Sequence, residues 1–330
     1  MQFRTLRIYQ AEGNAVRASL ENMSVNELTA GDVLIRVQYS SINYKDALAA
    51  TGAGKILRRY PLNGGVDLAG QVVESSDAAF SPGQSVLVTG CGLSETLDGG
   101  YAEYARVPAA AVIAVPAGLD ALAVMTLGTA GFTAALAIHR MEHNGLVPQH
   151  GPVAVTGATG GVGSIAIDML ATRGYRICAI TGKEVERDYL QQLGAQEICL
   201  RDQFKLTQTA LESARFAGAI DSLGGEWLSW LVRSTQPFGS VASIGMAAGA
   251  QLNTSVMPFI LRGVNILGIT SANTPREMRE RVWQRIATDL KPRHMDVIRT
   301  RIVPLNDLTK VFPEYLRGGV RGRTVVKIQD

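Results

Sequence analysis

The chain has 330 residues, of which 46% are hydrophobic and 18% are charged, and its formal net charge is +3 at pH 7. This composition is typical of a globular enzyme long enough for two domains, and it excludes a disordered chain. The small net charge gives no reason to expect a nucleic-acid partner, although it suits an anionic small substrate. The cysteines Cys91, Cys178 and Cys199 are scattered singly, which gives no disulfide framework and favours a reducing compartment.

The first part of the chain, to about residue 120, is rich in strand patterns and turns. Met1 to Tyr9 alternates like a strand and carries arginines, which is unlike a signal peptide. No apolar run reaches the length expected of a membrane span, so we expect a cytoplasmic protein with no membrane partner. Further strands are predicted over 34–39, 70–74 and 85–89, and together they indicate an all-β module of barrel type.

A change in composition marks the second part of the chain. Residues 121–140 carry helical spacing, interrupted by Gly128 and Gly131. From residue 151, strands alternate with helices, which predicts a doubly wound parallel sheet and an α/β fold. Its expected strands are 151–155, 175–180, 197–200, 218–221, 240–244 and 265–270, followed by a helix over 275–289.

The last predicted strand, 324–328, has no place in that parallel sheet and is expected to return to the first module. The sequence therefore predicts a β domain over 1–120, a nucleotide-binding domain over 121–291 and a return segment over 292–330. A cofactor and a substrate are expected to meet between such domains, at the carboxyl ends of the parallel strands.

A glycine-rich turn is the strongest functional signal in the sequence. It lies between the strand 151–155 and the helical pattern 164–173, which is the context that a dinucleotide-binding turn requires. Its glycines let the backbone approach a pyrophosphate and let the helix pack close to its strand, while the helix start favours an anion. The alternative is a tight turn without a ligand. The residues concerned are Gly157, Thr159, Gly160, Gly161, Val162 and Gly163.

The end of the next strand indicates which dinucleotide would bind. An NAD site usually places a carboxylate about 20 residues beyond the glycines, but here the strand ends in Thr181-Gly182-Lys183. A hydroxyl, a glycine and a cation suit a 2′-phosphate, so we predict NADPH as the cofactor. The alternative is that Lys183 is a solvated lysine beside Glu184. Arg201, after the strand 197–200, is either a further contact to the adenine or the phosphate, or a surface arginine.

Several segments resemble one protein family. The order of a GroES-like β-barrel domain, a Rossmann domain and a return strand resembles the medium-chain dehydrogenase/reductase superfamily. The individual segments look like its zinc-independent quinone-oxidoreductase branch, and within that branch like the bacterial acrylyl-CoA reductase group. These segments are 40–47 (SSINYKDA), 52–55 (GAGK), 65–70 (GVDLAG), 126–133 (TLGTAGFT), 256–262 (VMPFILR) and 322–324 (GRT).

The resemblance implies catalytic residues and the absence of a metal. Tyr44 would lie beside the nicotinamide and donate a hydrogen bond, or only pack against the cofactor while water supplies the proton. Asn43 would hold the nicotinamide ribose or the substrate carbonyl. Zinc-dependent relatives place a cysteine near Asn43 and Gly-His-Glu where this chain has Gly65-Val66-Asp67. We therefore expect no metal, and Asp67 to be a buried hydrogen-bonding group.

The other cofactor contacts also follow from the resemblance. Thr159, Gly160, Gly161 and Val162 would hold the pyrophosphate, and Thr181, Gly182 and Lys183 the 2′-phosphate. The nicotinamide end and its carboxamide would be lined by Met246, Ile260, Ser271 and Gly318. The alternative for Met246 and Ile260 is that they are ordinary core residues at strand ends.

The resemblance implies NADPH-dependent reduction of acryloyl-CoA to propanoyl-CoA, an activated C=C bond that needs no metal. The alternatives are a reductase of quinones, alkenals or enones, and a protein that binds NADPH without chemistry. Strand 265–270 resembles an edge strand that pairs across a twofold axis, which implies a homodimer. An acyl-CoA substrate would bring phosphates, which cations are expected to bind. The candidate cations are Lys55, Arg58, Arg59, Arg262 and Arg323. The alternative for each of them is a solvated role on the surface.

Overall fold

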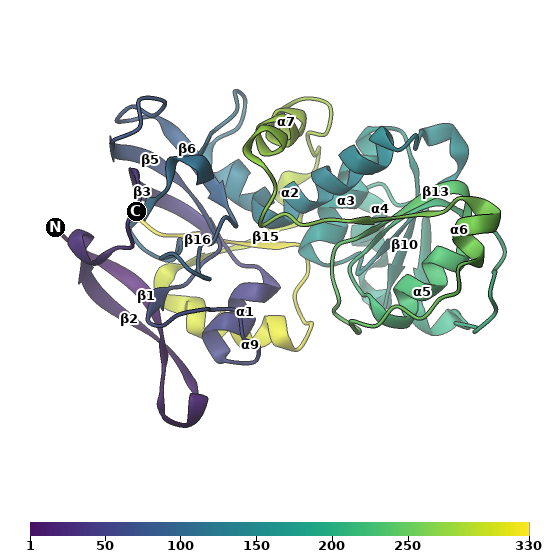
Figure 1. Cartoon of the computed structure of the whole chain (residues 1–330), viewed down its shortest axis with the longest axis horizontal. Helices are drawn as coiled ribbons and strands as arrows, with labels where there is room; N and C mark the ends of the chain where they lie inside the picture. The colour runs from purple at the N-terminus through teal and green to yellow at the C-terminus, as the bar shows by residue number, and fades with distance from the viewer. Residues whose placement is uncertain (330) are drawn as a thin grey trace. The chain divides into compact units, whose positions relative to one another are not determined.

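The computed structural model describes residues 1–329 and divides into two compact units (Figure 1). The first unit comprises residues 1–129, 271–283 and 295–330, and the second comprises 130–270 and 284–294. These bounds differ from the expected ones, because the second unit begins at residue 130 and residues 271–283 belong to the first. Each unit has its own sheet system and its own hydrophobic core.

The first unit holds a three-stranded sheet in the order β2-β1-β4 and a seven-stranded sheet in the order β15-β16-β3-β5-β6-β8, with β7 also paired to β3. Its strands are β1 (Gln2–Gln10), β2 (Val16–Ser24), β3 (Val33–Ser41), β4 (Leu62–Asn63), β5 (Asp67–Ser75), β6 (Ser85–Thr89), β7 (Tyr104–Val107), β8 (Ile113–Ala114), β15 (Arg299–Pro304) and β16 (Arg323–Lys327). β16 pairs antiparallel with β3, so the prediction of a return strand is confirmed.

Alternation along β3 shows how this unit builds its core. Val33, Ile35 and Val37 are fully buried in the main cluster, whereas Leu34 faces a smaller cluster with Phe3. Because successive side chains of a strand point to opposite faces, one strand serves both clusters. The helices of this unit are α1 (Tyr44–Thr51), α8 (Met295–Ile298) and α9 (Leu308–Leu316), and α1 lies beside α9 (Figure 1).

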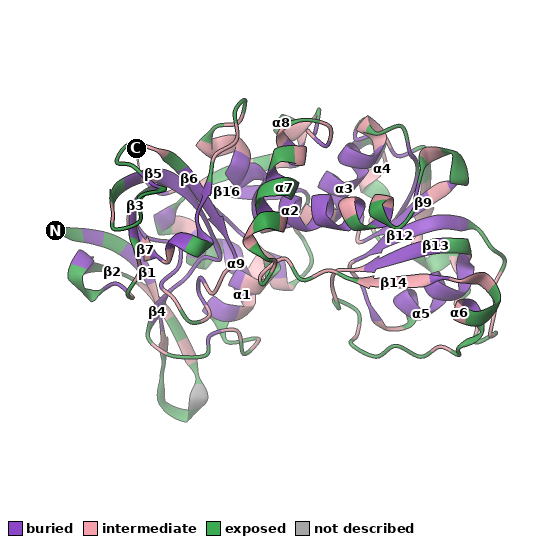
Figure 2. Cartoon of the chain, turned by 45° about the horizontal axis from the view of Figure 1, so that its top comes forward, coloured by how far each residue is buried: buried purple, intermediate pink, exposed green. Residues whose placement is uncertain are grey.

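The second unit holds a six-stranded sheet in the order β11-β10-β9-β12-β13-β14, in which every pairing is parallel. The predicted doubly wound parallel sheet is therefore confirmed. Its strands, mostly buried (Figure 2), are β9 (Pro152–Thr156), β10 (Arg176–Thr181), β11 (Glu197–Leu200), β12 (Phe216–Asp221), β13 (Thr235–Ser243) and β14 (Asn265–Gly268). Helices α3 (Gly161–Thr172) and α4 (Arg187–Gln192) cover one face, and α5 (Gly225–Ser234) and α6 (Met257–Arg262) cover the other (Figures 1 and 2).

Two helices contribute residues to both units: α2 (Ala121–His143) and α7 (Arg276–Ala287). In α2 the interruption predicted at Gly128 is confirmed, because this residue leaves the helical conformation with φ +52° and ψ −152°. The interruption predicted at Gly131 was wrong, since this residue is helical. The expectation that no segment has membrane length was wrong, since α2 is long and apolar enough to cross a membrane. However, 78% of its most apolar stretch is buried within the protein, as in a core helix.

Candidate active site

A buried carboxylate, Asp67 at the start of β5, organises the first unit around the candidate catalytic helix α1. Its Oδ2 accepts hydrogen bonds from Ser41 Oγ at 2.6 Å, from Asn43 Nδ2 at 2.8 Å and from the Thr129 amide at 3.0 Å. Its Oδ1 accepts one from Thr129 Oγ1 at 2.5 Å. Asp67 has no exposed surface, so the expectation of a buried hydrogen-bonding group is confirmed.

Arg323, on β16, neutralises this network and fixes the residues that precede α1. Its Nη2 donates to Ser41 Oγ at 2.7 Å and lies 3.9 Å from Asp67 Oδ2, while Nη1 donates to Asn43 Oδ1 at 3.1 Å. Arg323 also donates to the backbone carbonyls of Ile42 and Thr126, each at 3.0 Å. Arg323 is 2% exposed. The suggestion that it serves as a phosphate-binding cation was therefore wrong, because its donors are already committed inside the protein.

A second buried carboxylate, Asp46, lies in the first turn of helix α1. Its Oδ2 accepts the Asn43 amide at 2.8 Å, and its Oδ1 accepts the Val66 amide at 2.9 Å. Burial, and then the neighbouring charge of Asp67, raise the pKa of Asp46 to about 6. The side chain therefore caps the helix and also ties it to the segment that leads into β5.

These contacts distinguish the roles of the two predicted catalytic residues. The Asn43 side-chain amide donates to Asp46 and Asp67, and its oxygen accepts from Arg323. Asn43 is thus committed to holding the start of α1, and its predicted contact with ribose or substrate stays a prediction. Tyr44, the first residue of α1, is 51% exposed. Of the pair, Tyr44 is the side chain that this unit presents outward.

In the second unit, the glycine turn has the strand–turn–helix context that the sequence predicted. It leads from β9 into α3, whose first turn follows Gly160. A Cβ on Gly163 would lie 2.4 Å from the Gly157 carbonyl oxygen, so the close packing of the helix on the turn requires glycine there. A Cβ on Gly160 would meet only that same oxygen, at 3.2 Å. Apart from that oxygen, no heavy atom of residues 1–329 outside the turn lies within 4 Å of the Cβ position of Gly160.

A buried acid, Asp221 at the end of β12, holds the strand end that leads into this turn. Its Oδ1 accepts Thr156 Oγ1 at 2.6 Å, and its Oδ2 accepts the Gly224 amide at 2.8 Å. Burial raises the pKa of this carboxyl. Thr156 Oγ1 in turn accepts the Ser222 amide at 3.0 Å, so β9 and β12 are linked where the turn begins. Sequence reasoning missed Asp221, because an acid that closes a strand has no distinctive spacing.

The predicted 2′-phosphate residues meet at the carboxyl ends of β10 and β11. Thr181 is buried, and its Oγ1 accepts the Lys183 amide at 3.0 Å. A Cβ on Gly182 would lie 2.5 Å from Arg201 Nη2, so the guanidinium rests against the glycine backbone. Gly182 and Arg201 line a pocket with aromatic side chains, which suit an adenine ring, and with the acids Glu184 and Asp202. The pocket residues that the sequence did not indicate include Phe204 and Trp227.

Four residues predicted for the nicotinamide end fall into two groups. Met246 and Ile260 are 71% and 74% exposed, so the alternative that they are core residues is wrong. Ser271 and Gly318 belong to the first unit, whereas Met246 and Ile260 belong to the second. Their joint contact with a nicotinamide stays a prediction.

Two cysteines that the sequence treated as single lie together in the second unit. Cys178 Sγ and Cys199 Sγ are 3.4 Å apart, and Cys199 Sγ is 3.2 Å from Glu197 Oε1. Within residues 1–329 these three form the one close group of potential metal ligands. Burial raises the pKa of both thiols, and Glu197, the third member of the group, forms an ion pair with Arg215.

Two family models match most of the chain. The alcohol dehydrogenase GroES-like domain family matches residues 29–117, and the zinc-binding dehydrogenase family matches residues 161–288. Acrylyl-CoA reductase AcuI of Ruegeria pomeroyi is 43% identical over 320 residues, which cover 96% of each chain. YhfP of Bacillus subtilis, provisionally named a quinone oxidoreductase, is 45% identical over 322 residues, covering 97% of this chain and 98% of the relative.

Solved structures extend the similarity to the fold. The yhdH oxidoreductase from Salmonella enterica in complex with NADP is 43% identical and has a TM-score of 0.96. The match covers 100% of this chain and 100% of that chain. YhfP with NAD bound gives a TM-score of 0.96 at 43% identity, covering 99% of this chain and 100% of the other. With such identity over nearly the whole length, a GroES-like domain and a Rossmann domain, the protein belongs to the medium-chain dehydrogenase/reductase superfamily and is an oxidoreductase.

Proposed function

We propose that the protein reduces an activated C=C bond with NADPH, without zinc, and that its substrate is acryloyl-CoA, which it converts to propanoyl-CoA. One observation is the main support for the proposal. The side-chain amide of Asn43 donates its hydrogen bonds to Asp46 and Asp67, so the exposed Tyr44 beside it is the group that can contact a substrate. Where zinc-dependent relatives have a cysteine and a histidine, this chain has Asn43 and the buried Val66. This donor set does not suit zinc, which binds thiolates, imidazoles and carboxylates.

The chemistry follows from the remaining groups. NADPH would supply a hydride to the β-carbon of the enoyl thioester, which leaves negative charge on the carbonyl oxygen. The Tyr44 hydroxyl would donate a hydrogen bond to that oxygen as the charge develops. A proton from Tyr44 or from water would complete the reaction at the α-carbon. The Asp67–Arg323 network supports this role because it holds the start of α1 in place. It therefore also holds the backbone from which the Tyr44 side chain extends.

The choice of NADPH rests on the end of β10. No carboxylate stands where an NAD site usually has one, and Thr181, Lys183 and Arg201 gather there instead. Among relatives at 43% identity, one was crystallised with NADP and another with NAD, so family membership alone does not fix the preference. The absence of a carboxylate at the tip of β10, together with Lys183 and Arg201, supports NADPH.

The second candidate function is reduction of quinones, alkenals or enones, which the name of the YhfP relative favours. Turnover of NADPH with acryloyl-CoA, a small quinone and a simple enone separates the two. We expect the highest kcat/KM for acryloyl-CoA. A higher value for the quinone or enone would support the second candidate, and tight NADPH binding without turnover of any of them would overturn both.

We also infer a cytoplasmic homodimer. β14 is an edge strand of the six-stranded sheet, and an unpaired strand edge can pair with its copy across a twofold axis. Light scattering at micromolar concentration tests this, with a mass twice the chain's 35.2 kDa as the expected result. A monomeric mass would refute the dimer.

A further inference from the structure

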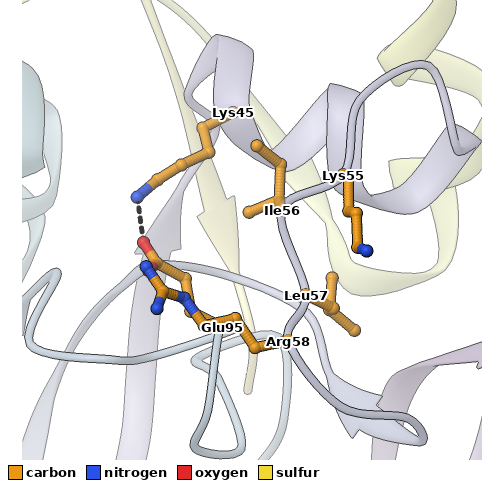
Figure 3. A pocket seen from close by; sticks show the side chains of 6 residues that line it. All are labelled: Lys45, Lys55, Ile56, Leu57, Arg58 and Glu95. Atoms are coloured by element: carbon orange, nitrogen blue, oxygen red, sulfur yellow. Dashed lines mark hydrogen bonds and ion pairs between the residues drawn. The ribbon is translucent and has the colours of Figure 1, made fainter.

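A cationic pocket in the first unit lies next to the catalytic helix and is not used by the proposed chemistry. Its lining comes from α1, from the loop after α1 and from the segment before β7 (Figure 3). Lys45, the second residue of α1, is the only lining residue on that helix, and the rest of the lining comes from residues 55–58 and Glu95. The lining residues are Lys45, Lys55, Ile56, Leu57, Arg58 and Glu95.

The pocket carries more positive than negative charge. Lys45 forms an ion pair with Glu95, and the backbone amide of Arg58 donates to the Glu95 carbonyl at 2.8 Å. The lining therefore holds three cations and one carboxylate, which leaves a positive excess. Lys55 and Arg58 are exposed, whereas Leu57 is 1% exposed and forms an apolar floor with the half-buried Ile56. A pocket with an apolar floor and a cationic rim suits a ligand that joins a flat ring to phosphates.

The other candidate cations do not offer such a site. Arg323 is buried in the Asp67 network. Arg262 donates to the backbone carbonyls of Arg233 and Glu212 at 2.8 and 2.6 Å, so it holds loops of the second unit together. Arg59 is exposed but does not line the pocket. Of the cations that the sequence offered, Lys55 and Arg58 line this pocket, and Lys45 lines it as well.

We propose that this pocket binds the phosphate-bearing nucleotide end of the acyl-CoA substrate. The inference rests on the proposed function and adds the residues that distinguish a CoA thioester from a small enone. The phosphates of CoA are separated from the thioester by the long pantetheine arm, so they need a site away from the tyrosine hydroxyl. Arg58 offers a planar fork of donors and the lysines offer point charges, both suited to phosphate oxygens.

The test compares two substrates that share the acryloyl thioester. Acryloyl-CoA carries the nucleotide, whereas acryloyl-N-acetylcysteamine ends after the short thiol and has no phosphate. We expect Lys55→Gln and Arg58→Gln each to lower the ratio of kcat/KM for acryloyl-CoA over the short thioester about tenfold, because charged contacts are lost. Glu95→Gln should raise the ratio, since it releases Lys45. Arg59→Gln removes the same charge one residue away from Arg58 and should leave the ratio at the wild-type value.

Direct binding gives a second readout. Titration of the NADP-loaded protein with CoA should show an affinity about tenfold weaker for Arg58→Gln than for wild type, and unchanged affinity for Arg59→Gln. A ratio that is equal in wild type, Lys55→Gln and Arg58→Gln would overturn the pocket assignment, as would an Arg59→Gln effect as large as that of Arg58→Gln. Failure of the wild-type protein to reduce either thioester would instead overturn the proposed function.

Discussion

A Cβ atom on Gly128 would lie 2.6 Å from Oδ2 of Asp67. The break in α2 therefore does more than bend a helix, because it lets the Thr129 amide reach the buried carboxylate at 3.0 Å. At that place Ser41 Oγ and Arg323 Nη2 would also lie within 2.8 Å of the added atom. The glycine leaves room for the charged network that holds the start of α1.

Gly128→Ala should destabilise the protein by about 2–4 kcal/mol, because it adds both backbone strain and a clash with a buried ion pair. Urea unfolding of wild type and variant measures this. Gly145→Ala, just after the same helix, is the control: its φ is +89° but nothing lies within 4 Å of its Cβ position. The control should lose about 1 kcal/mol from strain alone. Equal losses for the two variants would contradict the role of the network.

Arg323→Lys should cost about 2–3 kcal/mol although the charge is kept, because an ammonium cannot replace a guanidinium that donates to four groups in one plane. We expect kcat to fall as well, since the start of α1 loses two of its restraints. Unfolding and steady-state kinetics measure the two effects. Arg317→Lys, at an exposed arginine, should change stability by less than about 0.5 kcal/mol. A variant Arg323→Lys as stable as wild type would show that the fork geometry is dispensable.

Asp46 should make stability depend on pH. Its pKa is raised from 3.8 to about 6 in the folded protein, so between these values the folded state binds more protons than the unfolded state. The contribution of Asp46 to the unfolding free energy therefore falls as pH rises through this window, by on the order of 3 kcal/mol.

In Asp46→Asn this side chain cannot titrate. The unfolding free energy of wild type should therefore fall relative to that of the variant as pH rises from 4 to 7. Urea unfolding across that range measures it, and the carbon chemical shift of the Asp46 carboxyl should titrate near pH 6. A constant difference together with a titration near pH 4 would disprove the raised pKa.

Two glycines of the turn should respond differently to alanine. Gly163→Ala places a Cβ 2.4 Å from the Gly157 oxygen and should cost about 2–4 kcal/mol of stability. Gly160→Ala meets that oxygen only at 3.2 Å, so stability should change by less than about 1 kcal/mol. We expect Gly160→Ala instead to weaken NADPH binding, measured by fluorescence titration, because the methyl stands where the pyrophosphate would approach. Unchanged NADPH affinity in Gly160→Ala would argue against a ligand at this turn.

Lys183→Ala and Arg201→Ala should each weaken NADPH binding about 10- to 100-fold and NADH binding far less, since charged hydrogen bonds to the 2′-phosphate are lost. Titrations with both cofactors measure the difference. Arg176→Ala is the matched control, because Arg176 lies exposed at the opposite end of β10 and should affect neither cofactor. An equal loss for NADPH and NADH would show that these cations do not recognise the 2′-phosphate.

Much of the fold could be predicted because its signals are local. The strand 85–89 and the strand 197–200 were predicted with the bounds that the structure gives, and the glycine turn was placed between the correct strand and helix. Alternating or continuous apolar patterns and turn glycines are properties of neighbouring residues, so a sequence displays them directly. The error over α2 has the same origin: a core helix and a membrane helix share a composition, and only burial in the folded chain separates them.

The sequence by itself determined the architecture, the dinucleotide-binding turn and the acid-free end of β10, because each of these depends on residue types within one short segment. Only the tertiary structure decided which distant side chains meet. Parallel register sets Thr181 opposite Leu200 and so brings Arg201 against Gly182. Chain folding likewise buries Arg323 and brings Lys45, Lys55, Arg58 and Glu95 to one pocket. Such contacts are set by strand pairing and core packing across the whole chain, and for that reason no local pattern predicts them.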